Sequence, residues 1–538
     1  MKKVIYLLIV SLAIAFTACS KEKIDKVNPD DVTVNLNKAE LQARIETLNY
    51  PVTLNKLKAG LPTPLPELWA IARILPAKRT YSVFHWTNND GSVLRTTATD
   101  DAPLYTPAAN PSNPSNTTPY YLVEDNFWGG GSVDHGTHEE IFEGESLSIT
   151  GAGLLPGGTT PDYAYFTSHV RGDVFGGEIF AVRYDDNNGN DNSSALLAEV
   201  SIFDNTADYN DLTIDKTTSP YTLWVAGDNN ARGAIIRNMP LWGPNGLNTI
   251  LESPLDSPLD QKEYDQSAEV IGKSLTKYNM PLLGPSGNSV TIFNDQLWVV
   301  AGGTSYGGLV VMDKNDDSRL YTRTDVHHAK HFDMGEWNNG SGYYGAFLWG
   351  DGHFNNNKSN LRIFNTSIGP YAYTDYLAED AVDPEYKYGD VTFEGKNAID
   401  VHGNFVYMAM GADGIKKVSV TNGKIVDSYD LHEGQYPATY GGNGLANSLV
   451  VHGDFVYVAW GASGLLIFEK NDLAKGPVGQ YNGIGSCNYV AVDDVNVLTN
   501  PNNKSTADPV PPPTDTILWA GFGTGGMIML KFVNVVGN

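Results

Sequence analysis

Apolar and polar positions alternate over short runs along most of the chain, and one such run occurs twice. Residues 397–415 and 447–465 align without a gap and are identical at eleven of nineteen positions. In the first copy, the aromatic and β-branched run Phe405–Met410 lies between two turns rich in glycine, and a second apolar run covers 415–420. Short runs bounded by turn residues predict antiparallel strands joined in hairpins.

Each copy, with its flanking residues, predicts four short strands that form one small sheet. Such a sheet has two apolar faces and cannot bury both of them alone, so it has to stack on neighbours. Radial stacking of four-stranded sheets gives a β-propeller. The hairpin pattern recurs seven times, at residues 163–184, 221–237, 296–313, 344–365, 405–420, 455–469 and 516–532. The sequence therefore predicts an all-β protein with a single propeller over residues 120–538, with seven blades favoured over six or eight.

The segment before the propeller has a different pattern. Leu41, Ile45 and Leu48 recur at helical spacing, and residues 67–75 are compatible with one or two further helical turns. Residues 19–119 are thus expected to form a tether and a short, partly helical extension. A propeller ring needs closing, and we expect an N-terminal strand at 81–86 or at 120–124 to complete the last blade, because open sheet edges would otherwise remain exposed.

The first residues have the pattern of an export signal. Lys2 and Lys3 precede the apolar run 4–15, and Phe16-Thr-Ala-Cys19 follows, which predicts a secretory signal peptide over residues 1–18. The end of this segment resembles the lipobox of bacterial lipoproteins, in which the cysteine becomes lipidated. We therefore expect Cys19 to carry a lipid that holds the protein at the bacterial outer membrane. An ordinary signal peptide is the alternative. Residues 20–25 resemble the short charged tract of surface-exposed lipoproteins in the Bacteroidetes.

One strand carries a resemblance to a known family. The sequence Leu309-Val-Val-Met-Asp313, after Gly308, resembles the signature of LVIVD-repeat proteins, a family of bacterial β-propellers. Residues 360–365 and 464–469 are looser matches, and 415–419 departs from the pattern because two lysines stand inside the strand. The resemblance implies the propeller fold and a lipoprotein of the Bacteroidetes type. It implies little about activity, because one fold hosts many functions.

Charge narrows the choice of partners. The 538 residues carry a formal net charge of −26, and no cluster of lysine and arginine stands out. Nucleic acid is therefore a poor partner, since its phosphates are recognised by basic groups. With only two cysteines, Cys19 and Cys487, lipidation of the first leaves no internal disulfide.

Three segments hold residues that ligate metals. His135, His138 and Glu139 could bind zinc, but they lack the spacing that places ligands on one helical face, so a surface turn is favoured. The run 327–331 contains three histidines, and polar residues at a blade edge or channel are again favoured. The Asp/Asn-rich run 185–192 is a candidate calcium loop without the usual ligand order. No cofactor is required by the sequence, and calcium remains an alternative.

Four asparagines recur at the start of the strands expected to be innermost, and aromatic residues gather in the connections between blades. The asparagines are favoured as backbone mimics that fix the preceding loop, with a ring of ligand-binding amides as the alternative. The tyrosines suit carbohydrate or protein recognition as well as packing between blades. The candidate ligand-binding residues are Asn288, Asn397, Asn447, Asn488, Tyr436 and Tyr440.

The sequence contains no nucleophile motif such as Gly-x-Ser-x-Gly. We therefore expect a lipid-anchored extracytoplasmic propeller that acts as a binding or interaction module for an extracellular protein or glycan. The alternative is an enzyme with a site at the central face, possibly metal-assisted. Acidic or histidine residues converging from equivalent blade positions would favour the enzyme, and the asparagines at these positions favour binding.

Overall fold

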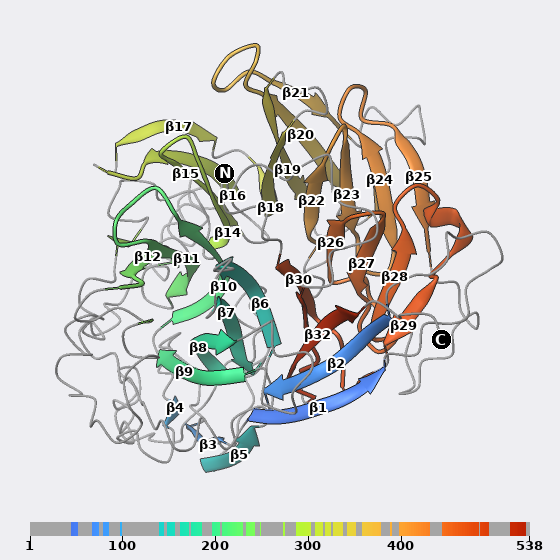
Figure 1. The fold of residues 1–538 in the computed structure, drawn as a ribbon. Coiled ribbons are helices and arrows are strands. Elements are labelled where there is room, and N and C mark those ends of the chain that lie inside the picture. Colours follow the sequence, from blue (N-terminus) through green and yellow to red (C-terminus); the bar gives the residue numbers. More distant parts are fainter. Residues whose placement is uncertain are drawn as a thin grey trace, which may run out of the picture.

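The structure of the protein is a computed structural model that describes strands and turns between residues 45 and 533. Before residue 148 it describes 45–51, 67–74, 79–84, 97–98 and 139–144. After that point it describes most of the chain apart from loop segments, of which the longest are 185–195, 249–272, 275–286, 431–443 and 494–516. Its strands form a ring of sheets around a central axis (Figure 1).

Six four-stranded sheets and one five-stranded sheet make up the ring. The first three four-stranded sheets are β6 (Ser148–Leu155), β7 (Asp162–Arg171), β8 (Val174–Tyr184) and β9 (Leu196–Asp204); β10 (Ala207–Asp215), β11 (Thr222–Asn229), β12 (Gly233–Pro240) and β13 (Lys273–Ser274); and β14 (Gly287–Phe293), β15 (Gln296–Gly302), β16 (Gly307–Asp313) and β17 (Arg319–Arg323).

The next three are β18 (His327–Glu336), β19 (Tyr343–Gly350), β20 (Ser359–Asn365) and β21 (Tyr373–Tyr376); β22 (Ile399–His402), β23 (Phe405–Ala409), β24 (Ile415–Ser419) and β25 (Ile425–Tyr429); and β26 (Ser448–His452), β27 (Phe455–Ala459), β28 (Leu465–Glu469) and β29 (Gly479–Tyr481). A 3-10 turn, η4 (Leu473–Lys475), precedes β29.

The five-stranded sheet closes the ring. It has the order β1-β2-β32-β31-β30, with β1 (Ile45–Pro51), β2 (Glu67–Ile74), β30 (Tyr489–Asp493), β31 (Ile517–Gly521) and β32 (Met527–Val533). The innermost strand is the first strand of each four-stranded sheet and β30 in the five-stranded sheet. These strands lie next to one another in the order β6, β10, β14, β18, β22, β26 and β30, with β30 beside β6. The all-β propeller is confirmed, and each of the seven expected hairpins forms the middle of one sheet.

Closure differs from the expectation. The strand that completes the last blade is β2, which pairs with β32, and not residues 81–86 or 120–124. Residues 81–84 belong instead to β3 (Arg79–Phe84), which pairs with β4 (Thr97–Ala98) and β5 (Glu139–Gly144); residues 120–124 lie outside the described residues. The propeller therefore includes residues before 120.

The expected helical turns in the extension are also wrong where the structure describes them, because β1 and β2 are strands. The physical reason is visible in β2. Leu68 and Ala70 pack into one hydrophobic cluster, whereas Ala72 and Ile74 pack into the cluster on the other side of the sheet. A strand covered on both faces is apolar throughout, and over eight residues such a run cannot be told from a helix by periodicity.

The core consists of clusters between neighbouring sheets. In β23, Val406 and Met408 pack toward β19 and β20, and Tyr407 and Ala409 pack toward β26, β27 and β28. All four side chains are at most 1% exposed. Successive residues of a strand point to opposite faces. The sheet β22–β25 is therefore held by apolar packing on two sides, as a blade between two neighbours must be, and the sheets β14–β17, β18–β21, β26–β29 and the closing sheet likewise each take part in two clusters.

Candidate functional site

Asparagine side chains join neighbouring blades at one end of the inner strands. Asn288 donates from Nδ2 to the carbonyl oxygen of Ala329, and Asn447 donates to that of Cys487 at 3.1 Å. Asn210, at the same place in its blade, donates across the boundary in the same way at 3.0 Å. These amides replace backbone donors between blades, so Asn288 and Asn447 act as backbone mimics, but toward the next blade and not toward the preceding loop.

The remaining two asparagines are also held by the fold. Asn397 is fully buried, with φ at 33° and its Nδ2 lying 3.9 Å from the sulfur of Met410. The backbone N–H of Asn488 donates to the carbonyl of Gly521 at 2.8 Å. The β18 blade has Lys330 at the corresponding position, directly after Ala329, which accepts from Asn288. Burial lowers the pKa of this lysine to about 8.

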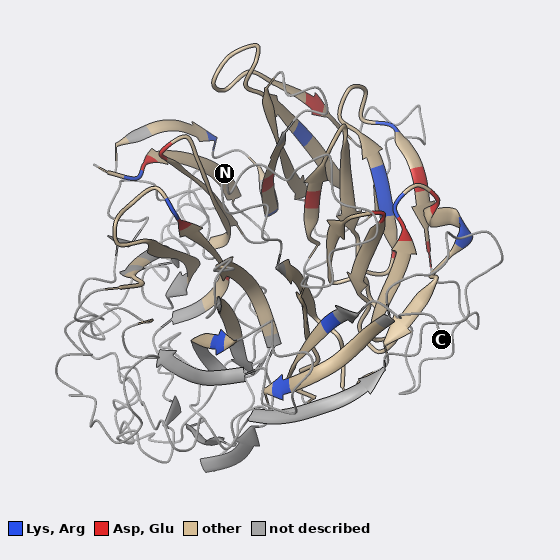
Figure 2. Ribbon diagram, in the orientation of Figure 1, with Lys and Arg blue, Asp and Glu red and all other residues tan. Residues whose placement is uncertain are grey.

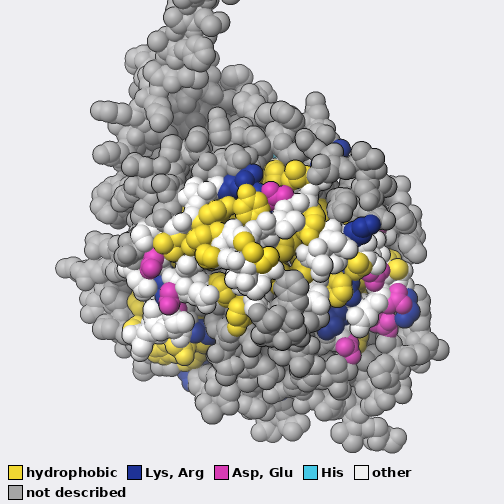
Figure 3. All heavy atoms as spheres, turned by 90° about the horizontal axis from the view of Figure 1, so that it is seen from above, with side chains coloured by type: hydrophobic (Ala, Val, Ile, Leu, Met, Phe, Trp, Pro, Cys, Tyr) yellow, Lys and Arg dark blue, Asp and Glu magenta, His cyan; other side chains and the backbone are white. Residues whose placement is uncertain are grey.

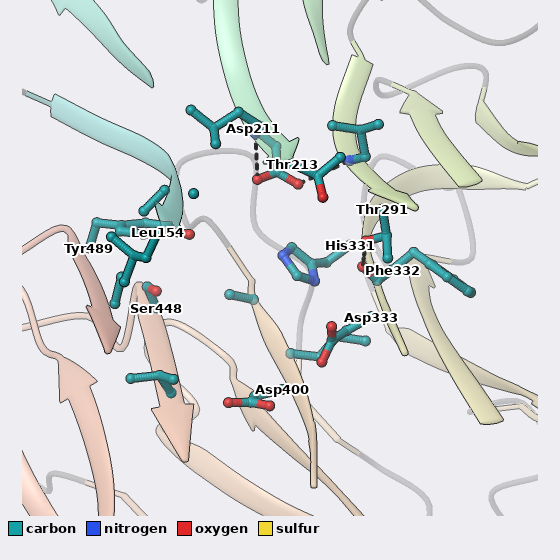
Figure 4. Close-up of a pocket in the computed structure, with 18 of the residues that line it drawn as sticks. Leu154, Asp211, Thr213, Thr291, His331, Phe332, Asp333, Asp400, Ser448 and Tyr489 are labelled. Carbon is teal, nitrogen blue, oxygen red and sulfur yellow. Dashed lines mark hydrogen bonds between the residues drawn. The ribbon is translucent and has the colours of Figure 1, made fainter. Parts of the chain in front are cut away.

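The inner strands enclose a cavity of about 290 Å³ on the axis of the ring (Figure 4). All seven inner strands contribute to its wall. Its lining divides into two arcs. Four consecutive strands, β10, β14, β18 and β22, supply most of the polar side chains, which are Asp211, Thr213, Thr291, His331, Asp333 and Asp400, with Lys216 just after β10. In Figure 2 the inner strands β18 and β22 each carry an acidic position.

The other arc is mostly apolar. Strands β26, β30 and β6 contribute Leu154, Leu449, Val450, Val490, Ala491 and Val492 to the lining. Ser448 and Tyr489, the first residues of β26 and β30, are the polar members of this arc. In Figure 4, Leu154, Tyr489 and Ser448 lie on one side of the cavity, across from Thr291 and Phe332, and the ring of His331 projects between them. The cavity is therefore amphipathic.

Two of the carboxylates occupy equivalent positions in adjacent blades. Asp333 accepts the backbone N–H of Val401 at 2.7 Å, and Asp400 accepts that of Val451, also at 2.7 Å. In each case a carboxylate of one inner strand binds the next inner strand around the ring. The side chains are thereby fixed in orientation at the wall of the cavity. One physical consequence is that little side-chain entropy remains to be lost when a ligand binds them.

Asp211 also binds the next inner strand, and it accepts a second backbone N–H from its own strand. Its Oδ2 accepts the N–H of Val290 at 3.0 Å and its Oδ1 accepts that of Leu212 at 2.8 Å. Burial nevertheless raises the pKa of this carboxyl to about 7, against the hydrogen bonds, which lower it. Burial also raises the pKa of Tyr489, and the charges of Asp211, Asp333 and Asp400 add to the effect. The phenol of Tyr489 is therefore a neutral hydroxyl at physiological pH.

Several predicted site residues lie outside the described part of the chain. These are Cys19, His135, His138, Tyr436 and Tyr440, together with the candidate calcium loop 185–192. Glu139 is the first residue of β5, and its side chain is not described. Within the described residues, no three histidine, cysteine or acidic residues are grouped so as to hold a metal ion. No helix in the same residues has the length and apolar character to cross a bilayer.

The described tyrosines of the inter-blade connections take part in packing. Tyr371 stacks on Tyr321 with ring centroids 5.0 Å apart. Tyr388 is fully buried and donates its hydroxyl to the carbonyl of Gly423 at 2.6 Å. Tyr376 donates to the carbonyl of Val420 at 3.3 Å. These three tyrosines therefore take part in packing between or within blades.

Some large apolar side chains are exposed on the outer strands. Leu320 of β17 is 42% exposed, Tyr373 of β21 is 43% exposed, and Ile368, just before β21, is 76% exposed. The guanidinium of Arg362 lies 3.7 Å from the ring centroid of Tyr373, a cation–π contact. Figure 3, a view from above the orientation of Figure 1, shows hydrophobic side chains interspersed with charged ones. Single exposed apolar residues are common on protein surfaces and do not by themselves define a docking face.

The carboxylates of the cavity were missed by reasoning from the sequence. A faint indication exists, because Asp400 follows Asn397 by three residues and Asp333 follows Lys330, its positional counterpart, by three. This spacing places the two carboxylates at one level of the ring. His331 belongs to the histidine run considered in the sequence, and the structure places it, half-buried, in the cavity. Ionisable groups thus do converge on the central face, contrary to the expectation of asparagine alone.

Comparisons with known proteins add one likeness of fold. No protein-family model and no curated protein matches the sequence. Among solved structures, the chain is similar to the WD40 β-propeller domain of Doa1, known from a crystal structure. The match covers 72% of this chain and 95% of that domain, with 8% sequence identity and a TM-score of 0.41. The assignment of the propeller fold rests on the strand pairing described above.

Proposed function

We propose that the protein is a lipid-anchored, extracytoplasmic binding module that recognises an extracellular protein or glycan. The observation that supports this most is the ring itself, in which side chains such as Asn288, Asn447 and Asp400 fix neighbouring blades to one another. A ring locked in this way presents its connections and its central face on a rigid scaffold. Binding residues are commonly carried on loops positioned by such a scaffold.

The proposed location follows from the N-terminus. The residues up to Cys19 resemble a lipoprotein signal, and those after it resemble the tract of surface-exposed Bacteroidetes lipoproteins. The LVIVD-like strands are consistent with such a protein. Tyr436 and Tyr440 remain candidate contacts on the connections, and no nucleic acid is expected among the partners of a chain with a net charge of −26.

Anchoring and exposure are tested together in whole cells. We expect the wild-type protein to fractionate with the outer membrane and to be cleaved when intact cells are treated with a protease. Cys19→Ser removes the thiol that receives the lipid, so this variant should lose its membrane association. Retention of the variant in the membrane at the wild-type level would show that the anchor is elsewhere.

Binding is tested with the purified protein on an array of polysaccharides and on secreted proteins of the same cells. We expect saturable binding to one of these, weakened in a Tyr436→Ala/Tyr440→Ala variant and retained in a Tyr371→Ala variant, because Tyr371 packs against Tyr321. Binding that is unaffected by the double variant would exclude the two tyrosines. Failure of every glycan and protein to bind would contradict the proposal.

An enzyme using the central face is the second candidate, and one observation favours it. Asp333 and Asp400 reach the cavity from equivalent positions, beside His331 and an Asp211 whose pKa is raised by burial to about 7. A carboxyl with a pKa near neutrality is suited to proton transfer. A screen for hydrolysis of glycosides and esters, repeated with Asp211→Asn, tests this candidate, which requires turnover in the wild type that the variant loses.

A further inference from the structure

We propose that the central cavity binds a small amphipathic amine, with the ammonium group toward Asp333 and Asp400 and the hydrocarbon part toward β26, β30 and β6. The inference concerns a site separate from the connections that carry Tyr436 and Tyr440, and it does not depend on what those connections recognise. Three features of the cavity support it, namely its division into two arcs, the charge of its polar arc and its size.

The division into arcs favours a ligand with two unlike sides. Most of the charged and hydroxyl-bearing residues of the lining come from four consecutive blades, which also contribute apolar residues. The remaining three blades contribute mainly apolar residues, with Ser448 and Tyr489 as the polar exceptions. A fully polar ligand would place some of its hydroxyl groups against Val450, Val490 and Val492. This is unfavourable, because those hydroxyl groups would lose their hydrogen bonds to water and find no partner in the wall. A hydrocarbon portion against these side chains is stabilised by the removal of apolar surface from water.

The charge of the polar arc favours a cation. Three carboxylates, Asp211, Asp333 and Asp400, face one lysine, Lys216, and one histidine, His331; Tyr489 is neutral. Asp333 and Asp400 lie at equivalent positions of neighbouring inner strands, each with its carboxylate fixed at the wall, so the ammonium group is placed toward these two. Hydrogen bonds between an ammonium and a carboxylate are about twice as strong as those between neutral groups. An anion would meet the same carboxylates with repulsion.

Size sets the scale of the ligand. The volume of about 290 Å³ lies just below the range of ligand pockets, on the order of 300–1,000 Å³, so the ligand should be small. The wall has no group of three metal ligands among the described residues, so the ionic partner of the carboxylates is better supplied by an organic cation. The two carboxylates are already fixed by Val401 and Val451, and a ligand therefore meets donors and acceptors that need no rearrangement.

Benzylamine is the probe that tests the proposal, with benzyl alcohol as its neutral counterpart. Titration calorimetry on the full mature protein should show saturable binding of benzylamine and at least about tenfold weaker binding of the alcohol, since loss of a charge-assisted hydrogen bond costs 1.4 kcal/mol or more, a factor of ten. This comparison uses only the wild-type protein and is independent of any variant's folding. Glucose, added in competition, should leave benzylamine binding unchanged.

The variants locate the site. Asp333→Asn and Asp400→Asn each keep an oxygen that can accept the N–H of Val401 or Val451, so the ring should remain folded. Each should weaken benzylamine binding about tenfold or more, whereas Asp454→Asn, in the turn between β26 and β27, should leave it unchanged. The proposal is overturned if benzylamine does not bind, if the alcohol binds equally well, if glucose displaces the amine, or if both cavity variants bind benzylamine as the wild type does. A glycan or protein bound at the connections would persist in all these cases.

Discussion

The carboxylate of Asp400 accepts the backbone N–H of Val451 across the boundary between two blades, at 2.7 Å. Asp333 and Val401 repeat the relationship one blade earlier. The bond stabilises the fold. Val451 lies on β26, the inner edge strand of its sheet, and its N–H has no neighbouring strand to bind on the inner side, so the carboxylate accepts it. The bond serves the cavity as well, because it holds a charged group in a fixed orientation at the wall.

Removing this carboxylate should destabilise the ring. We expect Asp400→Ala to lower the free energy of unfolding by about 1–3 kcal/mol, the cost of leaving a buried donor without its acceptor. Asp400→Asn should cost less, because its amide oxygen can still accept the N–H of Val451. Urea denaturation of both variants measures the difference. Equal midpoints for the alanine variant and the wild type would mean that the bond contributes nothing to stability.

The closing strand β2 should be indispensable for a soluble folded protein. The residues before β1 should be dispensable for it. Deletion of residues 67–74 uncovers the edge of β32 and the apolar side chains that Ala70 and Ala72 now cover. We expect this deletion to give aggregated protein, because an exposed apolar edge strand pairs with other chains. Deletion of residues 20–44 is the control and should leave a monomer in size-exclusion chromatography. A soluble monomer after the first deletion would show that β2 is not needed for closure.

The blades should be sensitive to substitutions of side chains that pack against a neighbouring blade. Val406→Asp places an unpaired carboxylate between β23 and the β18 blade, so it should prevent folding or lower the midpoint of denaturation strongly. Phe455→Ala, at a side chain that is 8% exposed, should cost about 3–5 kcal/mol. Phe405→Ala should cost less, because Phe405 is half-buried and also lies under the ammonium of Lys417 at 4.4 Å. A mild Val406→Asp would contradict the packing of this face of β23 against the β18 blade.

Asp211 should make stability depend on pH. Its folded-state pKa of about 7 lies above the ordinary value near 3.8, so the folded protein binds this proton more tightly than the unfolded chain does. The stability that the folded protein gains by holding this proton is therefore fully present below about pH 4. It is lost as the pH rises toward 7 and stays lost above that. The Asp211→Asn variant has no ionisable group at this position. The stability of the wild type relative to this variant should fall between about pH 4 and pH 7, as measured by denaturant midpoints. A difference that is constant, or that grows with pH, would show that burial does not govern this group.

The sequence predicts the blades well because their middle strands carry a local pattern. Runs such as Phe455–Ala459 are apolar on both faces and are bounded by turns, so each hairpin can be recognised without its neighbours. The closing strand could not be recognised in this way. Glu67–Ile74 is short and apolar at consecutive positions, and only pairing with β32, more than 450 residues later, distinguishes it from a helical turn.

The cavity could be predicted even less from the sequence. A single aspartate within a strand, such as Asp333, looks like a residue on a solvated face, and nothing local connects it to Asp400 or Asp211. The ring brings the three together, because the inner strands that carry them converge on one axis. The asparagines were noticed because they recur, and recurrence proved to mark a bond between blades for Asn288 and Asn447.

The closed ring is tested most directly by a disulfide between β2 and β32, the pair of strands that closes it. Ala70 of β2 lies opposite Leu530 of β32, and neighbouring strands place such residues within about 5.5 Å, the Cα separation that a disulfide requires. Leu518 of β31 lies opposite Leu530 on its other side, so it is about 10 Å from Ala70. In a Cys487→Ser background, we predict that oxidation links Ala70→Cys to Leu530→Cys and does not link Ala70→Cys to Leu518→Cys. Absence of the first disulfide in folded protein, or equal formation of both, would contradict the ring on which the cavity depends.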